Sequence, residues 1–136
     1  MTLKHLLIIQ SLSLLIIFSC NNSTDNNEKI SAGVPKIEFN EIEFDFGKIT
    51  SGEKVTHRFK YKNTGNGKLK ITETVAGCGC SSVKIDKNPI NADQTSYIEV
   101  TFDSKGFHGL QIKEIEVFTN ASNKPINLII SANVDI

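Results

Sequence analysis

After residue 36 the chain alternates between apolar and polar residues with a period of two, which is typical of strands that bury one face. In residues 55–62, one face carries valine, histidine, phenylalanine and tyrosine, whereas the other carries threonine, arginine and two lysines. Similar segments are found at 37–46, 69–75, 83–85, 97–103, 110–119 and 126–134. We therefore predict about seven short strands and no helix in this part of the chain.

Two of these segments carry irregularities. The first is interrupted near Asn40 and Glu41, and in 110–119 the apolar phase shifts between Ile112 and Ile115, which indicates a bulge. Residues 63–67 form a strong turn, because asparagine and glycine tolerate positive φ. Short strands separated by turns every 8–12 residues or so predict an all-β sandwich, with a barrel as the alternative.

The first residues of the chain follow a different pattern. Lys4 supplies a basic start, residues 6–18 are mostly apolar, and Ser19 is a small residue before Cys20. The apolar run is too short to span a bilayer core comfortably. Residues 17–20 resemble the lipobox of bacterial lipoproteins, with Phe18 as a departure, which implies cleavage before Cys20 and lipid attachment to its thiol. An ordinary signal peptide and an uncleaved anchor are the alternatives.

These features predict three regions: a signal peptide at 1–19, a disordered tether at 20–35 and a domain at 36–136. The tether is expected to be disordered because residues 21–29 contain no large apolar side chain. No acidic cluster follows Cys20. We therefore expect a lipid-anchored protein of the cell envelope that faces the periplasm rather than the cell surface.

The charge and motif content argue against several functions. The formal net charge is zero at pH 7 and no basic stripe occurs, so nucleic-acid binding has no electrostatic support. A Gly-x-Ser-x-Gly motif and a phosphate-binding glycine loop are both missing, and the carboxylates are scattered. We predict a protein without enzymatic activity and without a cofactor.

Several separated motifs occur in an order that resembles a known family. They are Phe44–Ile49, Gly52-Glu53, Phe59–Asn66, Leu69–Ile71, Cys78–Ser81, Ile98–Phe102, Gly109 and Val117–Asn120. This series resembles the bacterial domain of unknown function 1573, apart from residues 91–93, where Pro-Gly is more usual. The resemblance implies an immunoglobulin-like antiparallel sandwich in an exported protein. It implies no reaction, since none is assigned to the family.

Cys78-Gly79-Cys80 is the motif with the clearest chemical potential. A disulfide between the two cysteines needs a bend, which Gly77 and Gly79 permit, and lipid on Cys20 leaves an even pair in an oxidising compartment. Two packed free thiols are the second interpretation. The third is a copper or zinc site completed by His57 or His108, although we expect His57 to be half-buried with a backbone hydrogen bond.

The sequence therefore favours a membrane-tethered interaction domain, which binds an unidentified envelope protein by strand addition at a sheet edge. The alternative is a thiol-redox or copper- or zinc-handling protein that uses Cys78 and Cys80. The sequence does not fix the oligomeric state.

Overall fold

The computed structural model describes residues 33–136, so the predicted signal peptide, Cys20 and most of the predicted tether lie outside the described residues. Eight strands follow one another: β1 (Ile37–Phe39), β2 (Glu43–Thr50), β3 (Lys54–Asn63), β4 (Ile71–Ala76), β5 (Ser81–Ile85), β6 (Thr95–Asp103), β7 (Gly109–Thr119) and β8 (Ser122–Asp135). Within the described residues, no helix has the length and apolar character needed to cross a membrane.

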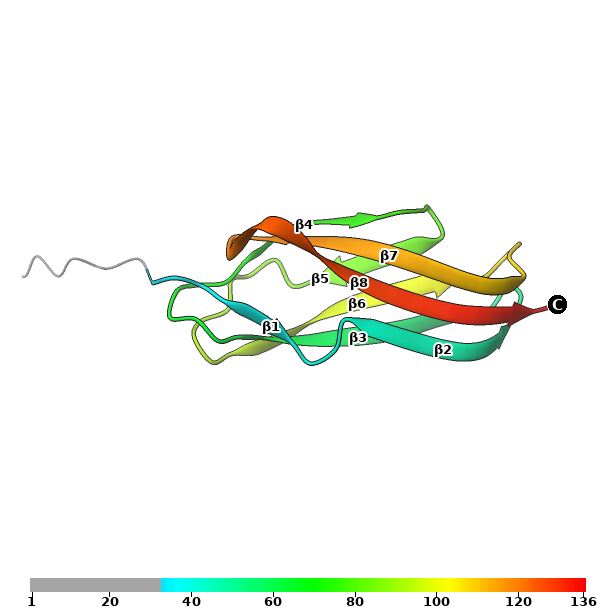
Figure 1. Cartoon of the computed structure of the whole chain (residues 1–136), viewed down its shortest axis with the longest axis horizontal. Coiled ribbons are helices and arrows are strands. Elements are labelled where there is room, and N and C mark those ends of the chain that lie inside the picture. Colours follow the sequence, from blue (N-terminus) through cyan, green and yellow to red (C-terminus); the bar gives the residue numbers. More distant parts are fainter. Residues whose placement is uncertain (1–32) are drawn as a thin grey trace, which may run out of the picture.

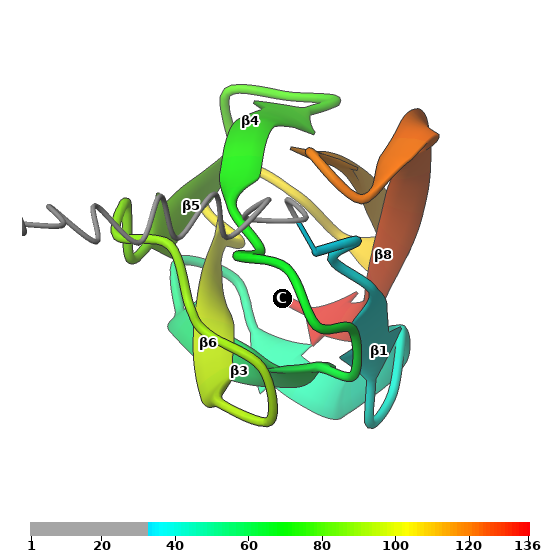
Figure 2. The same ribbon diagram turned by 90° about the vertical axis from the view of Figure 1, so that its left-hand side faces the viewer.

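The strands form two four-stranded sheets that pack face to face, as Figures 1 and 2 show. One sheet has the order β1-β3-β6-β5 and the other has the order β2-β8-β7-β4. All neighbours are antiparallel except β2 and β8, which run parallel. The prediction of an all-β, immunoglobulin-like sandwich is confirmed, with eight strands instead of about seven.

The core lies between the sheets and is built from alternate residues of the strands. Phe59 of β3 pairs in register with Ile98 of the neighbouring β6, and these two residues are buried together with Tyr61 of β3 and Val100 of β6. Their polar neighbours along each strand point outward, which explains the period of two in the sequence. The second sheet contributes Ile115, Val117, Leu128, Ile130, Ala132 and Val134.

The predicted strand at 37–46 is divided between the two sheets. β1 pairs with β3 in one sheet, and after a bend at residues 40–42 the chain continues as β2, which pairs with β8 in the other. The main-chain N–H of Ile129 donates to the carbonyl of Ile42 at this crossing, with 2.8 Å between the atoms. The irregularity predicted near Asn40 and Glu41 is therefore a change of sheet.

The predicted bulge between Ile112 and Ile115 is wrong. The pairing of β7 with β8 is continuous from Gly109 to Val117, and the register shifts only between Val117 and Thr119. The apolar phase changes because Lys113 faces inward near the end of the sandwich, where its ammonium lies 4.5 Å from the ring centroid of Phe107. A cation over an aromatic face is a favourable neighbour, so this inner position need not be apolar.

The turn at residues 63–67 differs from its prediction, since neither of its glycines has positive φ. Instead, residues 33–36 lie against the turn, and a Cβ on Gly65 or Gly67 would overlap their backbone. The N–H of Asn66 donates to the carbonyl of Val34 over 3.1 Å. Residues 33–36 therefore pack on the turn, where they satisfy several of their main-chain groups.

Candidate functional site

Cys78 and Cys80 form a disulfide in the turn that carries the chain from β4 in one sheet to β5 in the other. Their Cα atoms lie 5.2 Å apart. The turn is held on both sides: the N–H of Gly77 donates to Glu114 of β7 over 3.2 Å, and the carbonyl of Cys80 accepts from Asp103 of β6 over 2.9 Å. The disulfide therefore lies where the chain crosses from one sheet to the other.

A shallow depression of about 180 Å³ lies beside this turn. Cys80, Gly79 and the two serines that follow line it, together with Lys54, Thr101 and Asp103. The ammonium of Lys54 lies 3.1 Å from the carboxylate of Asp103. The pKa of Asp103 is held below its usual value, mainly by the backbone N–H of Lys105 and then by Lys54. The depression is thus lined by one cysteine of the disulfide and by the Lys54–Asp103 ion pair.

The two histidines proposed as metal ligands are not gathered with the cysteines into a metal site. In the part of the chain that the structure describes, no group of three or more histidine, cysteine or acidic side chains is placed to hold a metal ion. His57 is half-buried in a polar and aromatic setting: its Nε2 lies 3.0 Å from Glu41 and its ring stacks on Phe44 at 3.6 Å. The side-chain partner replaces the backbone hydrogen bond that we expected for His57.

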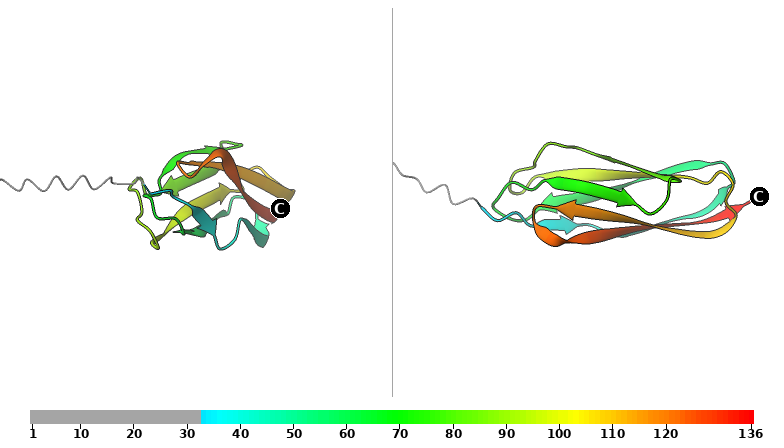
Figure 3. Two further views of the ribbon diagram at one scale, coloured as in Figure 1. Left: turned by 60° about the vertical axis from the view of Figure 1, so that its left-hand side comes forward. Right: turned by 90° about the horizontal axis from the view of Figure 1, so that it is seen from above.

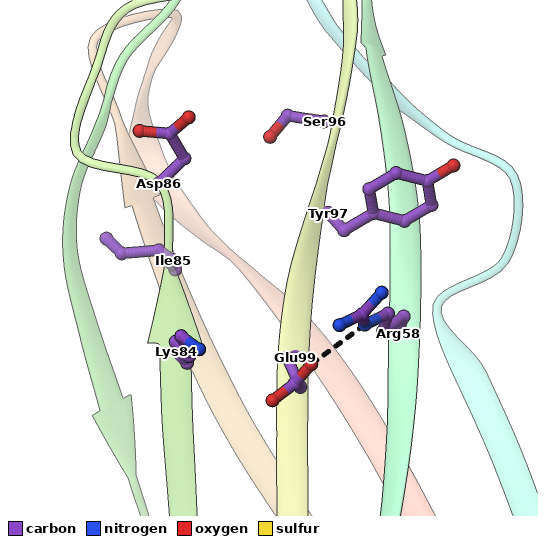
Figure 4. Close-up of a pocket in the computed structure, with 7 residues that line it drawn as sticks. All are labelled: Arg58, Lys84, Ile85, Asp86, Ser96, Tyr97 and Glu99. Carbon is purple, nitrogen blue, oxygen red and sulfur yellow. Dashed lines mark hydrogen bonds and ion pairs between the residues drawn. The ribbon is translucent and has the colours of Figure 1, made fainter.

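A second depression, of about 300 Å³, lies on the outer face of the β1-β3-β6-β5 sheet (Figure 4). Three strands contribute to it, with Arg58 from β3, Tyr97 and Glu99 from β6 and Lys84 from β5. Figure 4 shows the ion pair between Arg58 and Glu99, in which Nε lies 2.8 Å from the carboxylate. In the sequence, Arg58 is one of the polar residues on the second face of 55–62, and only the pairing of strands brings it together with Glu99 and Lys84.

The sheet edges are a further feature with functional potential. Within the described residues, β1 and β5 are the outer strands of one sheet and β2 and β4 are the outer strands of the other. β4 covers β7 only from Ile115 onward, so the first half of β7 also has a single neighbour, β8. Each such edge presents main-chain donors and acceptors to which an added strand can bind.

The solved structures that resemble this sandwich come from varied proteins. A Porphyromonas gingivalis W83 protein of unknown function has a TM-score of 0.62 at 16% identity, over 79% of this chain and 51% of that one. The VesB protease of Vibrio cholerae has a TM-score of 0.55 at 17% identity, over 75% of this chain and 32% of that one. The chain thus spans about half of the Porphyromonas protein and a smaller share of the protease.

A human domain is matched over most of its own length. PapD-like domain 7 of human CEP192 has a TM-score of 0.56 at 11% identity, over 74% of this chain and 85% of that one. At these identities the similarities show the shared fold alone. No curated protein matches the sequence.

The family comparison covers nearly all of the sandwich. The family model described as "Protein of unknown function (DUF1573)" matches residues 37–134, from the first residue of β1 almost to the end of β8. This agrees with the series of motifs found along the sequence. The chain therefore belongs to the DUF1573 family of proteins of unknown function.

Proposed function

We propose that this protein is a lipid-anchored, non-catalytic interaction module of the cell envelope, which faces the periplasm and binds another envelope protein. Residues 17–20 support the lipid anchor through their resemblance to a lipobox. The two-sheet fold supports the binding role, since its outer strands offer unpaired edges.

The free sheet edges are the observation that carries this proposal. An extended segment of a partner adds to such an edge through main-chain hydrogen bonds, and alternate side chains provide specificity. This mode of binding needs no catalytic residue, cofactor or deep cavity.

A cross-linking experiment in cells tests the binding role. A photoreactive amino acid is placed, one position at a time, at exposed sites on the outer strands and, as a control, at exposed sites on the two sheet faces. We expect one envelope protein to be cross-linked from positions along one edge. Cross-links that are absent, or equally frequent at every site, contradict the proposal.

The lipid anchor has a separate test. Cys20→Ala removes the thiol that would carry the lipid, so the variant should lose palmitate labelling and accumulate as an unanchored or unprocessed product. Cys78→Ser serves as the control and should remain labelled. A Cys20→Ala product that is still labelled with palmitate shows that the lipid is attached elsewhere.

Thiol chemistry is a second candidate, favoured by the disulfide that lines the depression beside Lys54 and Asp103. In exchange with a dithiol protein, the Cys78–Cys80 disulfide would gain two electrons and two protons to give two thiols, while the dithiol becomes a disulfide. In a Cys80→Ser variant the free thiolate of Cys78 should attack the disulfide form of that partner, giving a mixed disulfide and one partner thiol, which a non-reducing gel detects in cells. The reduced protein is also tested for stoichiometric Cu(I) or Zn(II).

A further inference from the structure

The sheet that contains β7 has a vacant position along part of its edge. β4 ends at Ala76 and the chain leaves through the disulfide turn, whereas β7 extends beyond this point toward Gly109. Figure 1 and the right-hand view of Figure 3 show β4 stopping partway along the molecule while β7 and β8 continue. The vacancy lies alongside residues 109–113 and is bounded at one end by Gly77, whose N–H bonds to Glu114.

The backbone at this vacancy points toward the missing neighbour. Along a strand, main-chain groups of alternate residues project to the same side. Glu114 projects its carbonyl toward the β4 side, where it accepts from Gly77, so Ile112 and Leu110 project their N–H and carbonyl groups to the same side. Within residues 33–136, no hydrogen-bond partner is found there for the main-chain groups of Leu110 and Ile112.

The side chains at the vacancy are apolar and exposed. Leu110 and Ile112 are 68% and 62% exposed on the outer face of the sheet. Lys113 does not cover them, because it faces inward and lies over Phe107. Both the backbone and the side chains of this edge therefore lack the cover that a neighbouring strand provides.

The other edges are protected in ways that this one is not. β1 has only three residues, and β5 has five, with Lys84 among its exposed positions. β2 has a register irregularity between Asp45 and Lys48, and β4 presents Glu73 on its exposed face. Short strands, bulges and charges are the common means of preventing unwanted pairing. By this comparison, the first half of β7 is the edge best suited to accept a strand.

The charge next to the vacancy indicates what kind of strand would fit. Glu114 and Glu116 of β7 continue the outer-face row of Leu110 and Ile112, and Glu116 pairs in register with Val75 of β4. Glu73 lies one outer-face position farther along β4. A segment with apolar side chains opposite Leu110 and Ile112 and a basic side chain near Glu114 matches this row, because opposite charges on one sheet face attract.

We propose that the first half of β7 is the binding site, and that its occupant is an extended segment of another envelope protein with outward-facing apolar residues and an adjoining basic residue. This inference rests on the proposed interaction function and assigns it to one edge. β7 begins at the end of the sandwich where β8 finishes, and Figure 1 shows that the described chain starts at the opposite end, so a domain tethered through its N-terminal side presents the site away from its attachment.

A matched pair of substitutions separates backbone pairing from side-chain contact. Ile112→Pro removes the N–H that faces the vacancy while leaving the ladder to β8 intact, and proline is tolerated at such outward-facing edge positions. Ile112→Thr keeps the N–H and the branched side chain but is more polar. Thermal melting establishes that both variants are folded.

The full chain is screened against displayed random peptides of about ten residues, the upper end of ordinary strand lengths. We expect selected peptides to alternate apolar residues, to contain lysine or arginine, and to bind Ile112→Pro about tenfold or more less tightly, with a smaller loss for Ile112→Thr. Amide exchange should be fast at Leu110 and Ile112 in the free protein and slow in the complex.

Each other outcome has a defined meaning. Peptides that bind equally to Ile112→Pro place the interaction on another edge, which overturns this inference and leaves the proposed function standing. Slow exchange at Leu110 and Ile112 in the free protein, together with self-association that Ile112→Pro abolishes, assigns the edge to a second copy. Selection of no peptide at all contradicts both the inference and strand addition as the function.

Discussion

Asn63 is a buried polar residue that links Lys36 to the body of the sandwich. Its side-chain amide donates to the carbonyls of Gly67 and Ile90, and its side-chain oxygen accepts from the N–H groups of Lys36 and Gly65. The side chain is fully buried. A single residue thereby joins Lys36, the 63–67 turn and the segment that precedes β6.

Asn63→Ala should lower the free energy of unfolding by about 3 kcal/mol, because several buried main-chain groups lose their partner. Asn66→Ala is the control, since the side-chain oxygen of Asn66 accepts only an exposed bond from Val34. Its cost should be below about 1 kcal/mol. Equal losses in chemical denaturation for the two variants would contradict the assignment to Asn63.

Asp45 gives a pH-dependent prediction. The N–H of Gly47 and then the hydroxyl of Ser131 hold the pKa of this carboxyl below its usual value of 3.8. The unfolded chain therefore binds the proton more tightly than the folded one, and the stabilising contribution, present above pH 3.8, is lost as the pH falls through the lowered pKa. Ser131→Ala should raise the pKa of Asp45 in an NMR titration, while leaving that of Asp93 unchanged.

At the scale of the elements, glycine in the 63–67 turn is required by packing. A Cβ on Gly67 would overlap the carbonyl of Gly33 and the nitrogen of Pro35, and both are backbone atoms that cannot rotate away. The contact between this turn and residues 33–36 therefore depends on the absence of a side chain at residue 67.

Gly67→Ala should detach residues 33–36 from the turn and lower the melting temperature by several degrees, equivalent to a loss of about 1–3 kcal/mol. Gly79→Ala is the matched control, because nothing lies within 4 Å of its added Cβ. The Asn66 N–H donates to the main-chain carbonyl of Val34, so the rate of hydrogen exchange at this N–H reports the detachment directly. A slowly exchanging Asn66 N–H in Gly67→Ala would show that the segment remains bound.

The elements also show which parts of the structure could be predicted from the sequence. The one-sided strands could be predicted where alternate residues are buried, as in β3, β6 and the second half of β7. The division of 37–46 between two sheets was not, since nothing in that alternation specifies which sheet each half joins. The vacancy beside Ile112 depends on where β4 stops relative to β7, and this is a property of tertiary pairing alone.

At the scale of the whole molecule, the disulfide contributes little to the stability of the sandwich. It joins residues only two apart, and the entropy that the unfolded chain loses when so small a loop is closed corresponds to about 1.5 kcal/mol of stabilisation. Neither cysteine is part of the buried core between the sheets, and Cys80 packs only against its margin.

Reduction of the Cys78–Cys80 bond should therefore leave the protein folded, with a loss of about 1–2 kcal/mol in the free energy of unfolding. Denaturation with and without reductant measures this loss, and the Cys78→Ser, Cys80→Ser double variant serves as the control for the reductant. Global unfolding on reduction would show instead that the turn organises both sheets.

The parallel pairing of β2 with β8 has a mechanical consequence. β2 and β8 run in the same direction along the long axis, with register from Glu43↔Ile129 to Thr50↔Asp135. Tension applied between residue 33 and residue 136 pulls these strands in opposite directions along their length, so it shears their hydrogen bonds together instead of opening them one by one. We expect a high rupture force when a single molecule is stretched from its ends, and a much lower force when β7 and β8 are peeled apart from their connecting turn.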